Sequence, residues 1–200
     1  MQQLPTTRAT LLLRLQDSAE QPAWDEFCAV YEPAVFRYAC RKGLSDADAQ
    51  DVVQEVLTAV FRSIDLWKAD DKRGSFRRWL SRVTRNAAVN ALRRNARREE
   101  ARGGSAPADL LATIPDSCTH EDETIGWEVR REMFRLAAER VCTQVAQRTW
   151  GAFQLTTLDG KTAAEASQEL GMPIGSVYTA KCRVLARLRN EIEAFLEDRP

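Results

Sequence analysis

The sequence is poor in histidine and in paired cysteines, and both shortages argue against a metal site. The chain has 200 residues, one histidine (His120) and five cysteines that lie far apart. No two cysteines form a Cys-x-x-Cys pair. Cys118 and His120 are two residues apart, but two ligands cannot close a tetrahedral zinc site. We therefore expect free thiols in a reducing compartment, with no metal and no cofactor.

Long apolar runs and an apolar leader are also missing. No run is long enough to span a bilayer, and no charged-then-apolar segment begins the chain. We therefore expect a cytoplasmic protein with no membrane partner. Catalysis on nucleic acid would need clustered acids around a metal, or a nucleophile beside a base. The main basic segment, residues 72–98, contains no acid, and the chain has one histidine, so we expect no catalytic residues.

Glycine and proline are scarce outside three short stretches, and helical periodicity dominates between them. The three stretches begin at Arg73, Gly103 and Gly171. Around the second one, residues 99–126 have little apolar periodicity, which is typical of a linker. The sequence therefore predicts an all-α fold with two helical domains, residues 1–98 and 127–200, joined by the flexible linker 99–126. The C-terminal domain is expected to contain a helix-turn-helix.

Capping residues locate several of the expected helices. In the N-terminal domain we expect helices over residues 10–16, 24–39, 46–64 and 75–98, the third capped by Ser45. In the C-terminal domain we expect helices over residues 127–145, 149–157, 163–170 and 174–197. Thr162 and Glu165 form a capping box before the third of these, and Gly171 is suited to end it.

The formal net charge of zero hides two predicted helices of opposite sign. The first of them follows Ser45. Its apolar residues share one face, namely Val53, Val56, Leu57, Val60 and Ile64. Asp48, Asp51 and Glu55 share the opposite face, where like charges at this spacing repel one another. This acidic face is either an ordinary solvated surface or a docking surface for a basic or polar partner helix.

The next predicted helix is strongly basic. Residues 72–98 contain ten basic residues and no acid. They are Lys72, Arg73, Arg77, Arg78, Arg82, Arg85, Arg93, Arg94, Arg97 and Arg98. So many positive charges repel one another unless a polyanion is bound. The guanidinium group of arginine can also donate two hydrogen bonds to phosphate oxygens, so we expect a nucleic-acid partner. We place Phe76, Trp79, Leu80, Val83 and Ala87 on the buried stripe. We place Arg77, Arg78, Ser81, Arg82 and Arg85 on the outer face.

Aromatic and basic residues meet in the segment that leads into this helix, residues 65–74. Trp67 and Phe76 border it, and Lys72 and Arg73 lie within it. An aromatic ring can stack on an unpaired base while a nearby cation meets the phosphate. Phe76 and Trp79 fall on the apolar stripe and are expected in the core. For Trp67 both a core role and a base-stacking role stay open.

Two predicted helices near the C-terminus match a helix-turn-helix. The turn over residues 171–173 is short and contains glycine. On the second helix, Val177, Val184 and Leu188 face the core. The outer face carries Ser176, Thr179, Arg183 and Arg187, with Tyr178 and Lys181 toward its flanks. This face suits a recognition helix in a major groove, although a short helix pair in an ordinary bundle is the alternative.

Three segments resemble the extracytoplasmic-function (ECF) group of the sigma-70 family of sigma factors. Residues 46–56 resemble the conserved second region. Residues 74–80, followed by Thr84, Arg85 and Asn86, resemble the promoter-melting part of the same domain. Residues 162–188 resemble the fourth region. Nothing but a linker lies between the two domains, which favours the ECF group. Residues 10–15 and 178–181 are similar to variants from planctomycete-like bacteria.

The resemblance implies an RNA polymerase sigma factor that binds core polymerase, recognises a promoter and promotes strand opening. Its partners would be the clamp coiled coil of the largest polymerase subunit, the flap of the second-largest subunit, and promoter DNA as duplex and melted strand. An anti-sigma factor is a further partner that the resemblance allows. The implied core-binding residues are Asp48, Asp51, Gln54 and Glu55. The implied minus-ten residues are Trp67, Lys72, Arg73, Arg77, Arg78, Arg82, Arg85, Asn86 and Asn90. The implied minus-thirty-five residues are Ser176, Tyr178, Thr179, Lys181, Arg183 and Arg187.

Two departures from the family pattern bear on promoter choice. Many members have aspartate where this chain has Asn90, and many have basic residues at the positions of Tyr178, Ala180 and Leu185. We therefore expect a different base preference at the upstream element. The rival interpretation is a helix-turn-helix regulator that acts without polymerase. That reading leaves the acidic face and the Trp67 segment unexplained.

Overall fold

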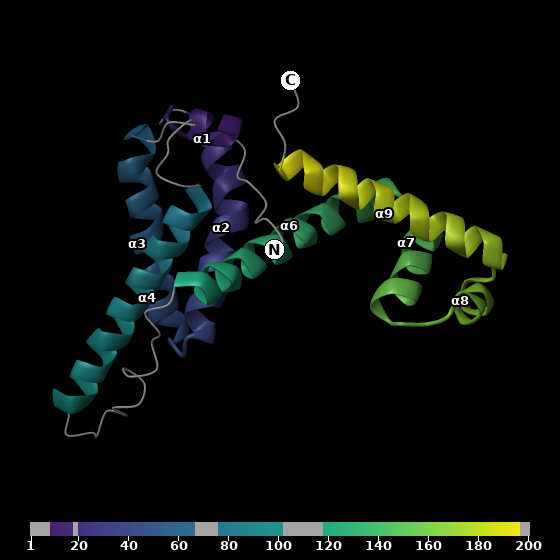
Figure 1. Cartoon of the computed structure of the whole chain (residues 1–200). Coiled ribbons are helices and arrows are strands. Elements are labelled where there is room, and N and C mark those ends of the chain that lie inside the picture. Colours follow the sequence, from purple (N-terminus) through teal and green to yellow (C-terminus); the bar gives the residue numbers. More distant parts are fainter. Residues whose placement is uncertain (1–8, 18–19, 67–75, 102–117, 197–200) are drawn as a thin grey trace. The chain divides into compact units, whose positions relative to one another are not determined.

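A computed structural model describes residues 9–17, 20–66, 76–101 and 118–196 (Figure 1). Every regular element in these ranges is a helix, which confirms the all-α prediction. The chain divides into two compact units, Met1–Glu132 and Met133–Pro200. No helix within the described ranges is long and apolar enough to cross a membrane. Trp67, Lys72 and Arg73 lie outside these ranges.

The first unit is built around three long helices. Its elements are α1 (Ala9–Leu15), α2 (Gln21–Arg41), α3 (Asp46–Ser63), η1 (Ile64–Leu66), α4 (Phe76–Ala101) and the first turns of α6 (Cys118–Gln144). Helix α3 packs against both α2 and α4 (Figure 1). The sequence expectations for α2, α3 and α4 agree with these bounds to within a few residues.

Local sequence explains where α3 begins and which side it buries. The Ser45 side chain accepts a hydrogen bond from the backbone amide of Asp48 at 3.2 Å, as the predicted cap requires. The predicted apolar face is buried, with Val53, Val56, Val60 and Ile64 almost inaccessible to solvent. Burying each such side chain stabilises the fold by about 1.5–3 kcal/mol. This packing fixes the outward direction of the opposite face of α3.

Aromatic contacts anchor the start of α4 on α2. The rings of Phe27 and Tyr31 stack with centroids 4.4 Å apart. Phe76 meets the ring of Phe27 edge-on at 6.0 Å, and Trp79 lies 5.6 Å from Phe76. Phe76 is buried and Trp79 half-buried, which confirms that Phe76 belongs to the core. The aromatic cluster therefore fixes the first turns of α4, which carry several of the predicted DNA-binding residues.

The second unit contains the end of α6, α7 (Gln147–Phe153), the π-helical segment η2 (Gln154–Leu158), α8 (Ala163–Leu170) and α9 (Ile174–Leu196). Its core includes Ala152, Leu155, Ala166, Val177 and Ala180. The predicted capping box is present, because Thr162 and Glu165 exchange hydrogen bonds between side chain and backbone. Gly171 ends α8 with a φ of +60°, a left-handed conformation that favours glycine. The capping box thus sets the start of α8, and Gly171 sets the turn between α8 and α9.

The predicted linker is helical at both of its ends. Helix α4 continues to Ala101, and α6 begins at Cys118 instead of near Trp127. The expected start of α6 was therefore wrong by more than two turns. Residues 102–117 lie outside the described ranges. The predicted domain boundaries stay predictions.

Candidate nucleic-acid interface

An exposed polar row runs along α4. Arg78, Arg82, Asn86 and Asn90 are all exposed and recur every four residues, a spacing that places them along one side of a helix. Arg93 and Arg97 extend the exposed set toward the end of α4, and Arg85 is half-buried beside it. The row can donate many hydrogen bonds to phosphates or base edges, as a nucleic-acid surface requires.

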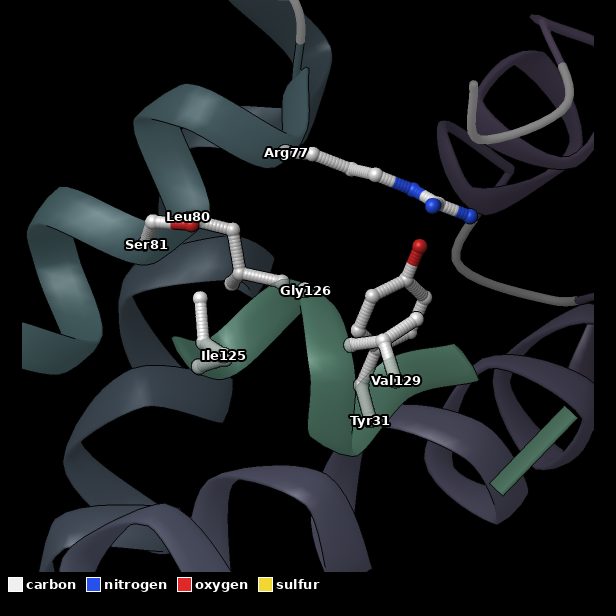
Figure 2. Close-up of a pocket in the computed structure, with 7 residues that line it drawn as sticks. All are labelled: Tyr31, Arg77, Leu80, Ser81, Ile125, Gly126 and Val129. Carbon is white, nitrogen blue, oxygen red and sulfur yellow. The ribbon is translucent and has the colours of Figure 1, made fainter. Parts of the chain in front are cut away.

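Arg77 and Ser81 do not belong to this row. The expectation that they point outward is wrong: Arg77 is 5% exposed and Ser81 is 8% exposed. The first turns of α6 cover them, and Ile125 and Val129 join Leu80 and Tyr31 around the same small pocket. Figure 2 shows the guanidinium end of Arg77 pointing toward the hydroxyl end of Tyr31. Arg77 is therefore placed to stabilise the first unit.

Two of the three acids on the predicted face of α3, Asp51 and Glu55, are exposed, and so is the neighbouring Gln54. The Asp48 carboxylate instead accepts hydrogen bonds from Ser45 Oγ at 2.5 Å and from Asn95 Nδ2 at 2.9 Å. These two hydrogen bonds lower the pKa of Asp48. Asp48 thus joins the start of α3 to α4.

The acids of α3 and the arginines of α4 meet at one exposed contact. Arg94 Nη1 lies 3.9 Å from Glu55 Oε2, and both side chains are about half exposed. A pair of this kind contributes little stability, because water screens both charges. Glu55 is therefore accessible for a stronger charged partner.

Two buried glutamates of α6 were missed by sequence reasoning. Glu128 and Glu132 are 2% and 1% exposed. Glu128 accepts hydrogen bonds from Arg37 Nε at 2.9 Å and Arg41 Nη1 at 2.7 Å, and Glu132 forms an ion pair with Arg37. Burial alone would raise the pKa of Glu128, but the hydrogen bonds from Arg37 and Arg41 outweigh burial and lower it. The signal in the sequence is a matching spacing: the two glutamates are four residues apart, and so are Arg37 and Arg41.

The residues predicted to contact the minus-thirty-five element lie on α9. Val177, Val184 and Leu188 are buried, as predicted, and Ser176, Tyr178, Thr179 and Arg183 are exposed. Lys181 is half-buried. Arg187 is exposed and donates a hydrogen bond to the Gln144 carbonyl oxygen at 3.3 Å, so it also holds the end of α6. The face predicted from the sequence is thus presented to solvent.

Cysteine and acidic side chains do not gather into a metal site within the described ranges. No group of three or more His, Cys, Asp or Glu side chains there could hold a metal ion. Cys28, Cys40, Cys142 and Cys182 are free thiols, and burial raises the pKa of Cys28 and Cys40.

Comparison with known proteins relates these surfaces to one family. Residues 28–98 match the family model for sigma-70 region 2. The match covers α3 and most of α4, including the exposed acids and the polar row. The chain is similar to ECF sigma factors. Over 178 aligned residues it is 29% identical to the ECF RNA polymerase sigma factor SigE of Mycolicibacterium smegmatis. The alignment covers 87% of this chain and 63% of that protein.

Two further ECF sigma factors match over almost their whole length. The ECF RNA polymerase sigma factor RpoE of Cereibacter sphaeroides is 25% identical over 187 residues, which is 94% of this chain and 96% of that protein. The ECF RNA polymerase sigma-E factor of Escherichia coli K12 is 23% identical over 198 residues, which is 95% of this chain and 96% of that protein. These matches support a sigma-factor function in transcription initiation.

Proposed function

We propose that this chain binds core RNA polymerase, recognises promoter DNA and promotes strand opening at the start of transcription. The observation that carries the proposal is the opposite charge of two packed helices. Helix α3 presents exposed Asp51 and Glu55, and its neighbour α4 presents exposed Arg78 and Arg82. One surface suits a basic protein helix and the other suits DNA. A subunit that joins polymerase to a promoter needs both.

The proposed core-binding surface consists of Asp51, Gln54 and Glu55. Their exposure and shared helix support contact with the clamp coiled coil of the largest polymerase subunit. Asp48 contributes indirectly, because its bonds to Ser45 and Asn95 hold the start of α3 against α4.

The proposed minus-ten surface consists of Arg78, Arg82, Arg85, Asn86 and Asn90. Cations along α4 would hold phosphates, while the two asparagine amides can pair with base edges. Trp67, Lys72 and Arg73 would extend this surface toward an unpaired base that stacks on the indole ring. Binding the unpaired strand more tightly than the duplex shifts the equilibrium toward the open promoter. No covalent bond is made or broken in this step, so the proposed role is not enzymatic.

The proposed upstream reader is the helix-turn-helix formed by α8 and α9. Its support is the short turn after Gly171 and the exposed outer face of α9. We extend the proposal to three finer points: a contact of this unit with the flap of the second-largest polymerase subunit, regulation by an anti-sigma factor, and action in the cytoplasm. The planctomycete-like subgroup also stays a prediction.

Gel-shift assays with and without core polymerase separate this function from that of an autonomous helix-turn-helix regulator. DNA fragments are first selected from a random pool by the chain together with core enzyme. We expect specific binding of these fragments at physiological salt only when core enzyme is present. Specific binding by the chain alone, unchanged by core enzyme, would favour the autonomous regulator.

A further inference from the structure

The first two turns of α9 lack the side chains that usually read guanine or adenine. Between Gly171 and Ala180 the chain has no Arg, Lys, Asn, Gln, Asp or Glu. Bidentate pairing with guanine needs Arg or Lys, and bidentate pairing with adenine needs Asn or Gln. These turns therefore cannot read bases by bidentate hydrogen bonding.

Large apolar side chains are exposed on the same turns. Ile174 is 48% exposed and Tyr178 is 58% exposed. They lie four residues apart and so share one side of the helix. Leu185 continues this exposed apolar side two turns further on, at 39% exposure.

The hydroxyl groups nearby are only partly available for base recognition. Thr179 Oγ1 donates its hydrogen to the Gly175 carbonyl oxygen at 2.9 Å. That bond leaves the Thr179 hydroxyl as an acceptor only. Ser176 and Tyr178 also carry hydroxyls, so the chemistry available for base discrimination at the front of α9 is apolar contact and single hydroxyl hydrogen bonds.

Charge favours DNA as the molecule that covers this apolar side. Between Glu169 and Glu191 the chain has four basic residues and no acid. They are Lys181, Arg183, Arg187 and Arg189. Cations further along the helix can meet phosphates and base edges of a duplex while the first turns enter the groove. An apolar protein partner would not need these four basic residues beside the apolar side chains.

We propose that Ile174 and Tyr178 read thymine in the upstream promoter element through its C5-methyl group. In the major groove this methyl is the apolar feature that distinguishes thymine from the other bases. The inference rests on the proposed function and adds a base preference to it. The upstream element of this chain should contain thymine where the first two turns of α9 lie, and Arg183 should act further along the site.

Replacing thymine by deoxyuridine tests the inference, because this change removes only the methyl group. Upstream elements are first selected from random DNA by the chain with core polymerase, and each thymine is then replaced in turn. Losing one buried methyl should weaken holoenzyme binding about fourfold at a contacted position. In Ile174→Ala or Tyr178→Ala the same replacement should have no further effect. Leu158→Ala, which removes an exposed apolar side chain outside α9, is the control, and it should keep the full sensitivity to deoxyuridine.

The possible results separate this inference from the proposed function. Selected elements without thymine, or no effect of deoxyuridine at any position, would overturn the thymine contact. An equal deoxyuridine effect in wild type and in both variants would overturn the assignment to Ile174 and Tyr178. Equal loss of binding in Tyr178→Ala and Leu185→Ala without any deoxyuridine effect would show a protein contact instead. Failure of the chain to direct core polymerase to any DNA would overturn the proposed function itself.

Discussion

Arg41 and Glu128 are 87 residues apart in the chain, yet Arg41 Nη1 lies 2.7 Å from Glu128 Oε1. The contact attaches α6 to the C-terminal end of α2. Arg37 strengthens it by bonding to both Glu128 and Glu132. Ile125 and Val129 of the same helix line the pocket that contains Arg77 and Ser81, so this contact helps to hold the cover over those two residues of α4.

Removing the Glu128 carboxylate should destabilise the first unit. Breaking a buried ion pair costs about 3 kcal/mol or more, because the partner charges lose their compensation. We expect Glu128→Ala to lower the free energy of unfolding by roughly this amount in urea denaturation followed by circular dichroism. Glu139→Ala is the matched control, because Glu139 forms an exposed pair with Arg135. It should change stability by less than about 1 kcal/mol, and equal effects of the two variants would contradict the buried network.

The pH dependence of stability should show the same network. The pKa of Glu128 is lower in the folded protein than in the unfolded chain, so the unfolded state binds the extra proton. Stability from this group is present above the ordinary glutamate pKa of about 4.3 and is lost as pH falls further. The difference in unfolding free energy between wild type and Glu128→Gln should therefore be largest near neutral pH and shrink under acid. A difference that grows as pH falls would contradict the sign of the shift.

Substitutions of Arg77 and of Arg82 should have different effects, the first on the stability of the chain and the second on promoter opening. Arg77 is buried, so Arg77→Ala should lower the melting temperature of the free chain. Arg82 is exposed, so Arg82→Ala should leave that temperature within a degree or two and reduce promoter opening severalfold. Opening is measured by the permanganate reactivity of unpaired thymines in the holoenzyme complex. The reverse pattern would show that Arg77 leaves the core to contact DNA.

The sequence predicted helix ends and helix faces well where local signals decide them. Ser45, the Thr162–Glu165 box and Gly171 all act within one turn of the backbone that they stabilise. The apolar face of α3 follows from spacing alone. The burial of Arg77 and Glu128 could not be predicted in this way, because their neighbours lie in segments far apart in the chain. An arginine or a glutamate on a helix is ordinarily exposed, and only the position of α6 reverses that expectation here.

Reversing charge on the outer face of α3 should disrupt core binding. Asp51→Arg with Glu55→Arg replaces two exposed acids on the proposed docking surface. We expect co-purification with core polymerase to be lost while the circular dichroism spectrum stays unchanged. Asp25→Arg with Glu139→Arg makes the same change in net charge at exposed positions on other helices, and it should bind core polymerase normally. Retained binding by the α3 variant would show that another surface docks.

Arg183 should act at the upstream element and leave core binding unaffected. It is exposed on α9 and takes no part in the core of the second unit. We expect Arg183→Ala to reduce transcription from a promoter with an intact upstream element by about tenfold, the range for loss of one bidentate base contact. On a promoter with that element scrambled, the variant and the wild type should be equally weak. An equal further loss on the scrambled promoter would refute base reading by Arg183.

Run-off transcription with purified core polymerase shows whether this chain directs the enzyme to a promoter. The template carries a promoter selected by core enzyme together with this chain. We expect transcripts from one start site only when the chain is added, none with Asp51→Arg and Glu55→Arg combined, and few with Arg78→Ala and Arg82→Ala combined. Core polymerase that starts equally well without the chain, or that is repressed by it, would show that the chain does not act in initiation as proposed.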